Sequence, residues 1–268
     1  MTRGKEGFVN LHVHTEYSLF ESLVGIDELI ESVKEQGATT CAITDTGNMF
    51  GAIEFYEKAK KMEIKPIIGA EIKVRALAHN SSGGSMIFLA KNSEGYQNLM
   101  QIVTAGSIER GQNQEPSIGQ DLLKKHSAGL IALSGGINGE IGKLLLEERD
   151  EEAWDIVLEY SRIFGKENFY LELQATDIDR QDELNSLNVK VSHHLDVPLV
   201  ITCPVRYIKK EDQCAYESLW NASNTGNQRA GTYLKTEEEL KKKYWWVPEG
   251  ITNTSKIAAM CDLELDIN

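Results

Sequence analysis

His12 and His14, two histidines separated by a single residue, are the residues of this chain whose types and spacing most clearly suggest chemistry. They close the segment Phe-Val-Asn-Leu-His-Val-His at residues 8–14, which predicts a β-strand. Side chains alternate across a strand, so we expect one face to hold Phe8, Asn10, His12 and His14, and the other Val9, Leu11 and Val13. Paired imidazoles at a strand end commonly begin a transition-metal site. Further ligands would have to come from the ends of other strands.

The elements that would position these ligands are helices and strands in alternation. Strands are predicted where short apolar runs occur, at residues 40–44, 66–74, 86–90, 130–134, 169–173 and 198–202. Helices are predicted at residues 26–33, 50–62, 94–103, 121–126, 151–164 and 182–195, with a polar loop at 111–116. This alternation predicts an α/β fold built from βα units around a mostly parallel sheet or barrel.

The strand signal stops after Tyr207. Two or three helices are expected to close the chain, one of them at residues 249–260, with Trp245 and Trp246 packed between them. A new extended segment is predicted to begin at residues 263–268, which is compatible with a natural stop and, at least as readily, with a piece of a longer polypeptide. The predicted division is a barrel at residues 1–210 and a helical extension at residues 211–268.

Length, composition and charge narrow the class of protein. The 268 residues, 41% hydrophobic and 26% charged, are ordinary for a globular protein with one barrel or two smaller domains. No apolar run approaches the length of a membrane span. Cys41, Cys203, Cys214 and Cys261 have no metal-site or disulfide-framework spacing, which predicts reduced thiols in the cytoplasm. A net charge of −13 argues against strong direct DNA binding.

Polar residues gather at the predicted carboxyl ends of the strands, where α/β barrels carry their functional groups. They are His12, His14, Asp45–Asn48, Glu71, Gly135–Gly136, Gln174 and Cys203–Tyr207. Their order resembles the PHP (polymerase and histidinol phosphatase) domain family, and specifically the domains that open bacterial DNA polymerase III alpha subunits. Six blocks carry the resemblance, at residues 11–18, 43–51, 64–71, 89–99, 129–135 and 170–174.

The resemblance implies a distorted (β/α)7 barrel whose strand ends hold up to three metal ions that hydrolyse phosphoesters. His12 and His14 match the first two ligands, and Glu71 matches a carboxylate that often bridges metals. The remaining positions depart from the family pattern. Glu21 replaces the usual Asp, and the other replacements are Thr46 for His, Ser85 for His, Gly136 for Cys, Pro204 for Asp and Arg206 for His.

Arg206 is the most informative departure. Its guanidinium is always charged and offers no lone pair to a metal, so it would repel the cations that the family site holds. We expect Arg206 to lie within salt-bridge distance of Glu71 or Glu21 and to neutralise these carboxylates. His12, His14, Glu21 and Glu71 would then form a vestigial, unoccupied site. Zn or Mn would bind only if the residual site still works.

Other features have simpler interpretations. The pair His193–His194 is expected at a solvated helix end, and Asp177 and Asp179 as acids that favour a helix N-terminus. The glycine-rich residues 135–140 lack the Lys and Ser/Thr of a phosphate-binding P-loop and predict a tight strand-to-helix turn.

The resemblance therefore implies the N-terminal PHP domain of a replicative, DNA-directed DNA polymerase. It implies that this domain is not itself catalytic and that it has structural and partner-docking roles. Its implied partners are the remainder of the alpha subunit and a proofreading exonuclease subunit, with DNA contacted only indirectly and no membrane. The alternative is a metal-dependent phosphoesterase or 3′-5′ exonuclease with a reduced metal site. A stand-alone histidinol-phosphatase-like enzyme is a third interpretation, disfavoured by the polymerase-type block at residues 90–96 and the helical tail.

Overall fold

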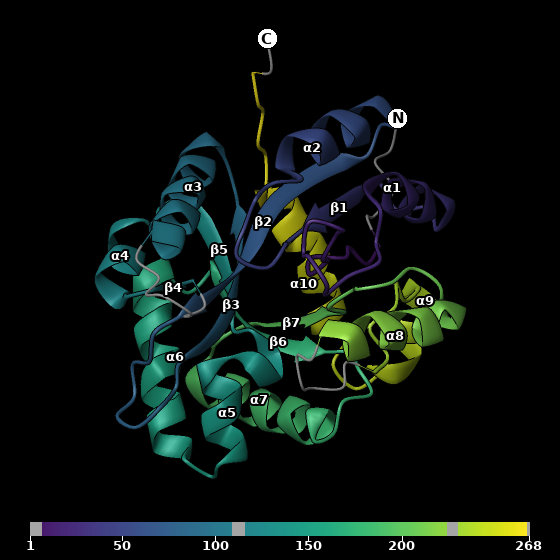
Figure 1. Cartoon of the computed structure of the whole chain (residues 1–268). Coiled ribbons are helices and arrows are strands. Elements are labelled where there is room, and N and C mark those ends of the chain that lie inside the picture. The colour runs from purple at the N-terminus through teal and green to yellow at the C-terminus, as the bar shows by residue number, and fades with distance from the viewer. Residues whose placement is uncertain (1–6, 109–115, 224–229, 267–268) are drawn as a thin grey trace.

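The computed structural model describes residues 7–108, 116–223 and 230–266, which form one curled sheet surrounded by helices (Figure 1). The sheet has seven strands in the order β1-β2-β3-β5-β6-β7, with β4 paired to β2 outside this path. The strands are β1 Thr40–Ile43, β2 Lys65–Val74, β3 Gly84–Ala90, β4 Ser117–Ile118, β5 Leu130–Leu133, β6 Phe169–Gln174 and β7 Leu199–Thr202. The α/β prediction is confirmed.

Strand directions make this barrel irregular. The β1–β2, β2–β4, β5–β6 and β6–β7 pairs are parallel, as expected for βα units. Strand β3 instead runs antiparallel to both β2 and β5, with Gly69 opposite Leu89 in the β2–β3 ladder. It follows β2 directly along the chain, through the connection at residues 75–83. The two-residue strand β4 was not predicted.

The N-terminal segment joins the two ends of the curled sheet. On one side, Ala42 N donates to Asn10 O at 3.0 Å and Thr44 N donates to Val13 O at 2.7 Å. On the other side, Val205 N donates to His12 O at 3.0 Å and His14 N donates to Val205 O at 2.9 Å. Residues 10–14 therefore lie between β1 and the segment that follows β7, and they close the barrel.

The described helices follow the predicted pattern, with three of them after Tyr207, except that the helix at residues 140–146 was not predicted. They are α1 Ile26–Glu35, α2 Ala52–Lys61, α3 Ser93–Ile108, α4 Gln120–Lys125, α5 Glu140–Leu146, α6 Asp150–Phe164, α7 Gln181–Leu195, α8 Gln213–Ser223, α9 Glu237–Lys243 and α10 Pro248–Met260. The turn predicted at residues 135–140 contains the 3-10 helix Gly136–Asn138 and leads into α5. Residues 111–115 of the predicted polar loop lie outside the described residues.

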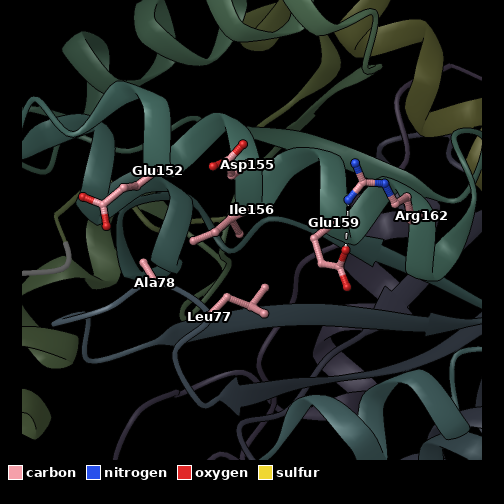
Figure 2. Close-up of a pocket in the computed structure, with 7 residues that line it drawn as sticks. All are labelled: Leu77, Ala78, Glu152, Asp155, Ile156, Glu159 and Arg162. Carbon is pink, nitrogen blue, oxygen red and sulfur yellow. Dashed lines mark hydrogen bonds and ion pairs between the residues drawn. The ribbon is translucent and has the colours of Figure 1, made fainter.

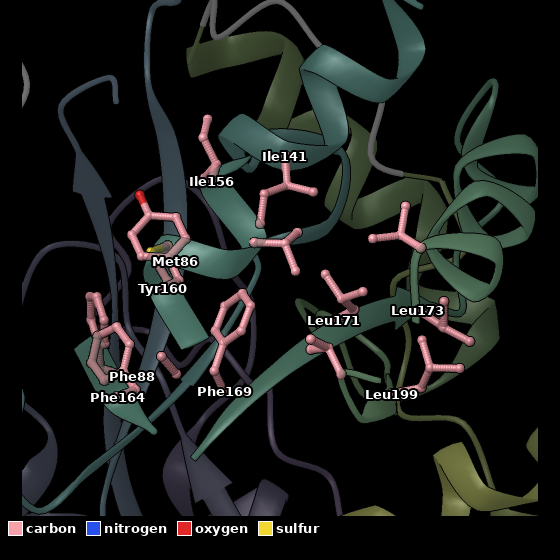
Figure 3. Close-up of a cluster of buried hydrophobic side chains, with 14 of the residues drawn as sticks. Met86, Phe88, Ile141, Ile156, Tyr160, Phe164, Phe169, Leu171, Leu173 and Leu199 are labelled. Carbon is pink, nitrogen blue, oxygen red and sulfur yellow. The ribbon is translucent and has the colours of Figure 1, made fainter. Parts of the chain in front are cut away.

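Two apolar layers follow from strand alternation. Outward-facing strand residues, such as Phe88, Phe169 and Leu171, pack against helices including α6, which contributes Ile156 and Tyr160 (Figure 3). The inward-facing residues of the same strands form a separate cluster inside the barrel: Ala42, Ile67, Ile87, Leu89, Ile131, Leu133, Tyr170 and Val200. Ile257, Ala258 and Cys261 of α10 and its C-terminus complete that interior cluster.

Two local predictions are wrong: the regular strand at residues 8–14 and the packing of Trp245 and Trp246 between helices. Within residues 8–14 only Val13 forms a ladder bridge, and it packs with α1 and α2 whereas Val9 and Leu11 lie inside the barrel. A regular strand would put all three on one face, so the segment is extended but not regular. Trp245 and Trp246 do not pack between helices, because the short α9–α10 connection turns at the surface and leaves them 77% and 43% exposed.

Other expectations agree with the structure. His193 and His194 are exposed near the end of α7, and Asp177 and Asp179 precede that helix. Cys41, Cys203, Cys214 and Cys261 are free thiols, of which only Cys214 is exposed. Within the described ranges, no helix combines the length and apolar character needed to cross a membrane.

Candidate functional site

The barrel interior changes from apolar to polar towards the carboxyl ends of its parallel strands. Along each strand an inward apolar residue is followed by an inward polar one: Ala42 by Thr44, Ile67 by Glu71, Tyr170 by Glu172, and Val200 by Thr202. All four polar side chains are buried. Such a buried polar layer over an apolar plug places the candidate site at the mouth where α/β barrels carry function.

His12, His14 and Glu71 meet at this mouth. The Nε2 atoms of the two histidines lie 3.1 Å apart, and Glu71 Oε2 lies 3.5 Å from His12 Nε2 and 3.2 Å from His14 Nε2. Ligands about 2.0–2.1 Å from a tetrahedral Zn²⁺ would be roughly 3.3 Å apart. The three atoms therefore have the spacing of one face of a single-ion site.

Arg206 brings a positive charge next to His14 and Glu71. Its side chain is 3% exposed, and Nη1 donates to Glu21 Oε2 at 2.8 Å. Its Nη2 lies 3.2 Å from His14 Nε2 and 3.8 Å from Glu71 Oε2. The predicted pairing of Arg206 with Glu21 and Glu71 is confirmed. The guanidinium faces two of the three atoms that would hold an ion, so these residues do not fit the family's multi-ion cluster.

Glu172 is a site residue that the sequence analysis missed. The carboxylate is fully buried. Its Oε1 atom lies 2.7 Å from His12 Nδ1 and also accepts a hydrogen bond from Thr202 Oγ1 at 2.5 Å. Gln174 Nε2 donates to the other oxygen, Oε2, at 3.2 Å. A carboxylate behind a histidine fixes the ring and its tautomer. The available signal was strand alternation, which puts Glu172 on the inward face with Tyr170 and Gln174.

Burial and neighbouring charges shift the pKa values of the two histidines in opposite directions. Burial lowers the pKa of His12, but Glu172 and Glu71 more than offset it and raise the pKa to about 9. Burial and then the Arg206 charge lower the pKa of His14 to about 3. Burial raises the pKa of Glu71, but hydrogen bonds from His12 and His14 hold it well below its ordinary value. Near neutral pH these shifts leave His12 protonated between the two carboxylates and His14 neutral.

Comparison with known proteins places this arrangement in a family. The family model of the PHP domain matches residues 10–176. The chain belongs to the PHP family. It is homologous to the N-terminal region of DNA polymerase III alpha subunits.

Two relatives illustrate that homology. DNA polymerase III subunit alpha of Borreliella burgdorferi is 37% identical over 273 residues, which cover 95% of this chain and 24% of the relative. The Treponema pallidum subunit is 34% identical over 275 residues, covering 96% and 23%. The chain thus spans about a quarter of the length of these relatives.

A solved structure supports the fold. A candidate metal-dependent phosphoesterase of Bifidobacterium adolescentis superposes with a TM-score of 0.50 at 12% identity, covering 89% of this chain and 96% of that one. At this identity the similarity concerns the PHP-like fold and not the chemistry of the site.

Two residues at positions that depart from the PHP pattern, Thr46 and Gly136, make other contacts in this structure. Thr46 Oγ1 donates to Glu21 Oε2 at 3.0 Å and lies 3.3 Å from His14 Nδ1. Gly136 has a φ of 55°, and a Cβ built there would lie 2.2 Å from the Gln174 side chain. The Gln174 amide thus occupies the space that a ligand side chain at position 136 would need.

Asp45 holds the loop that follows the two histidines. Its carboxylate accepts from Thr15 N at 2.6 Å, Thr15 Oγ1 at 2.8 Å and Ser18 Oγ at 2.6 Å. Ser18 Oγ in turn lies 3.3 Å from His14 Nδ1. Asp45 therefore serves as a buried anchor for the loop and does not join the three-residue group.

The site has little free space. A cavity of about 20 Å³ is lined by His12, Glu71, Gln174 and Arg206 among others, which is room for about one water molecule. A wider groove of about 380 Å³ lies elsewhere, between Leu77–Ala78 and α6 (Figure 2). Two of its acids already pair with cations, Glu152 with Arg149 and Glu159 with Arg162 and Lys124. We assign the groove no chemistry.

Proposed function

We propose that this chain is the N-terminal PHP domain of a replicative bacterial DNA polymerase, with a structural and docking role and no hydrolytic activity of its own. Homology over about 95% of the chain to alpha subunits supports the polymerase context. A replicative polymerase of this kind would work in the cytoplasm. Nucleotidyl transfer would be carried out by residues in the remainder of such a polypeptide.

The position of Arg206 is the observation that carries the non-hydrolytic part of the proposal. An always-charged guanidinium beside His14 and Glu71 supplies positive charge where the family holds metal ions. With His12 protonated, the Glu21 and Glu71 carboxylates are balanced by the protein itself. Metal-assisted hydrolysis needs ions that orient substrate and activate water, and this geometry disfavours them.

We also propose that residues 1–210 and 211–268 are a barrel and a helical extension with different roles. The barrel would hold the former metal site, and the extension would lead towards the rest of the polymerase. A proofreading exonuclease subunit is a second proposed partner, suggested by the resemblance to alpha subunits.

The alternative function is a phosphoesterase or 3′-5′ exonuclease with a reduced metal site. One observation favours it: His12 Nε2, His14 Nε2 and Glu71 Oε2 already have the spacing of three ligands to one ion. Glu21 could add a fourth oxygen only by releasing Arg206.

Measurements of bound metal and of phosphoester hydrolysis distinguish the structural domain from the phosphoesterase. We expect protein purified without chelator or metal-affinity resin to contain close to no Zn, Mn or Fe per chain. Excess Zn²⁺ or Mn²⁺ should leave the melting temperature nearly unchanged, because no metal contributes to the fold. The protein should not hydrolyse bis(4-nitrophenyl) phosphate. Stoichiometric metal, together with turnover that is lost in His12→Ala, would establish the phosphoesterase instead.

A further inference from the structure

Large apolar side chains are exposed around the mouth of the barrel. Of the nine large hydrophobic residues exposed in the described part of the chain, five lie in two segments beside the site. They are Leu19, Phe20, Leu23, Phe50 and Ile53, together called the mouth face below. Scattered exposed apolar residues are normal, but a gathered set of this size marks an interaction surface.

Hydrogen bonds tie the two segments of the mouth face to each other. Asn48 Nδ2 donates to Tyr17 O at 3.0 Å, and Tyr17 Oη donates to Glu54 Oε2 at 2.6 Å. A Cβ built on Gly51 would lie 2.7 Å from the Tyr17 ring, so the segments are in close contact. The mouth face is also joined to the site, because Leu23 N donates to Arg206 O at 2.8 Å.

Phe20 adds a conformational observation. Its φ of 61° lies in the left-handed region, which is unfavourable for a bulky side chain, yet this side chain is 67% exposed. Phe50 is 75% exposed. The isolated domain thus keeps a strained aromatic in water without burying it, which is expected when the burying surface belongs to another part of an assembly.

The charges around the mouth face limit what could cover it. Glu16, Glu54 and Glu57 lie in or beside its two segments, where Lys58 pairs with Glu54 at 2.7 Å, and the whole chain carries a net charge of −13. Nucleic acid would be repelled by these carboxylates. A second copy in a two-fold dimer would bring the same acids together. The fitting occupant is a protein surface with apolar side chains surrounded by lysine and arginine.

We propose that the mouth face packs against the remainder of a longer polypeptide that contains this chain. The proposal rests on the proposed function and goes beyond it by naming the surface. Its support is that the chain accounts for only 24% and 23% of the two alpha subunits compared above. Most of such a polypeptide is therefore available to cover an apolar face that this domain leaves open.

Hydrogen exchange followed by mass spectrometry tests the proposal on the full-length polypeptide and on this chain alone. Amides in residues 17–24 and 48–54 should exchange roughly 10-fold or more slowly in the full-length polypeptide. The double variant Phe20→Asp/Phe50→Asp should abolish that protection. Met100→Asp, a matched change on the exposed face of α3, should preserve it. Both variants of the isolated chain should melt near the wild-type temperature, because the replaced side chains are exposed.

The other outcomes separate this inference from the proposed function. Equal exchange in both proteins, with a full-length polypeptide that extends primed DNA, would overturn only the inference. An isolated-chain dimer that the double variant dissociates would assign the face to a second copy. Protection of the isolated chain by a single-stranded oligonucleotide would assign it to nucleic acid. A polypeptide without DNA synthesis would overturn the proposed function and the inference together.

Discussion

At the scale of single residues, three carboxylates and two basic side chains meet in the barrel mouth. Glu21 and Glu71 contact Arg206, and Glu71 and Glu172 contact His12. Buried carboxylates of this kind require a cation, because an uncompensated charge is costly in a low-dielectric interior. In this PHP domain the cations are side chains, so the network should depend on Arg206 and on the proton of His12.

Replacement of Arg206 should therefore be costly. Arg206→Met leaves Glu21 and Glu71 without their guanidinium, and we expect a loss of about 3–5 kcal/mol in the free energy of unfolding measured with urea. Arg162→Met, which removes an exposed cation from a surface pair with Glu159, should cost about 1 kcal/mol or less. Losses of equal, small size would mean that Arg206 does not stabilise the network.

The proton of His12 gives a pH dependence. Its folded-state pKa of about 9 exceeds the ordinary value of 6.5, so its stabilisation is complete below pH 6.5 and is lost as the pH rises through 9. Wild-type unfolding free energy should fall by roughly 3 kcal/mol between pH 6.5 and 9 from this group. His12→Gln should flatten the profile, and His126→Gln should not. A slope unchanged in His12→Gln would refute the assignment.

At the scale of elements, the strands of this PHP barrel approach one another closely where β2 passes β3. Gly69 faces inward between Ile67 and Glu71 on β2, and a Cβ there would lie 2.5 Å from Phe88 O and 2.8 Å from Leu89 Cδ2. Glycine in a strand interior normally weakens the strand, and close backbone approach is the usual reason for its presence. The β2–β3 pair sets the position of Glu71.

A pair of alanine substitutions tests this view of the strand. Gly69→Ala should lower the free energy of unfolding by about 1–3 kcal/mol, because backbone and Leu89 would have to move. Gly106→Ala in helix α3, where the nearest atom would be 3.4 Å away, should be neutral or stabilise by up to about 1 kcal/mol. Urea unfolding measures both, and a Gly69→Ala protein as stable as Gly106→Ala would contradict the packing argument.

At the scale of the whole molecule, α10 links the last part of the chain to the first. Thr254 Oγ1 accepts from Val9 N at 3.0 Å, and Asn253 Nδ2 donates to Leu199 O at 2.6 Å. Ile257 and Ala258 enter the barrel interior cluster. Helix α10 thus closes the end of the barrel opposite the site, so this helix should unfold together with the strands.

This predicts one cooperative transition. Far-ultraviolet circular dichroism and tryptophan fluorescence should give coincident urea curves. Ile257→Ala should cost about 2–5 kcal/mol by opening a cavity between α10 and the strands. Lys256→Ala, on the exposed side of the same helix, should change the free energy by no more than about 0.5 kcal/mol. Two separated transitions would show instead that residues 211–268 form an independent unit.

The sequence by itself determined much of this PHP domain. Apolar stripes at helical spacing, as at Ile26, Leu29, Ile30 and Val33, and short apolar runs predicted the helices and strands, because these periods are local properties. The spacing of His12 and His14 and the motif around Glu71 predicted the group that the structure brings together. That the side chain at position 206 offers no lone pair to a metal was likewise visible in the residue type alone.

Only the tertiary structure decided which groups compensate one another. Glu172 lies 160 positions from His12 in the chain, and no local spacing encodes their contact. Thr202, Gln174 and α10 reach their places only when the barrel closes, and Trp245 and Trp246 stay outside because of how α9 and α10 turn. Buried charges are satisfied by whichever partners the fold brings within a few ångströms, and that proximity is a property of the closed barrel.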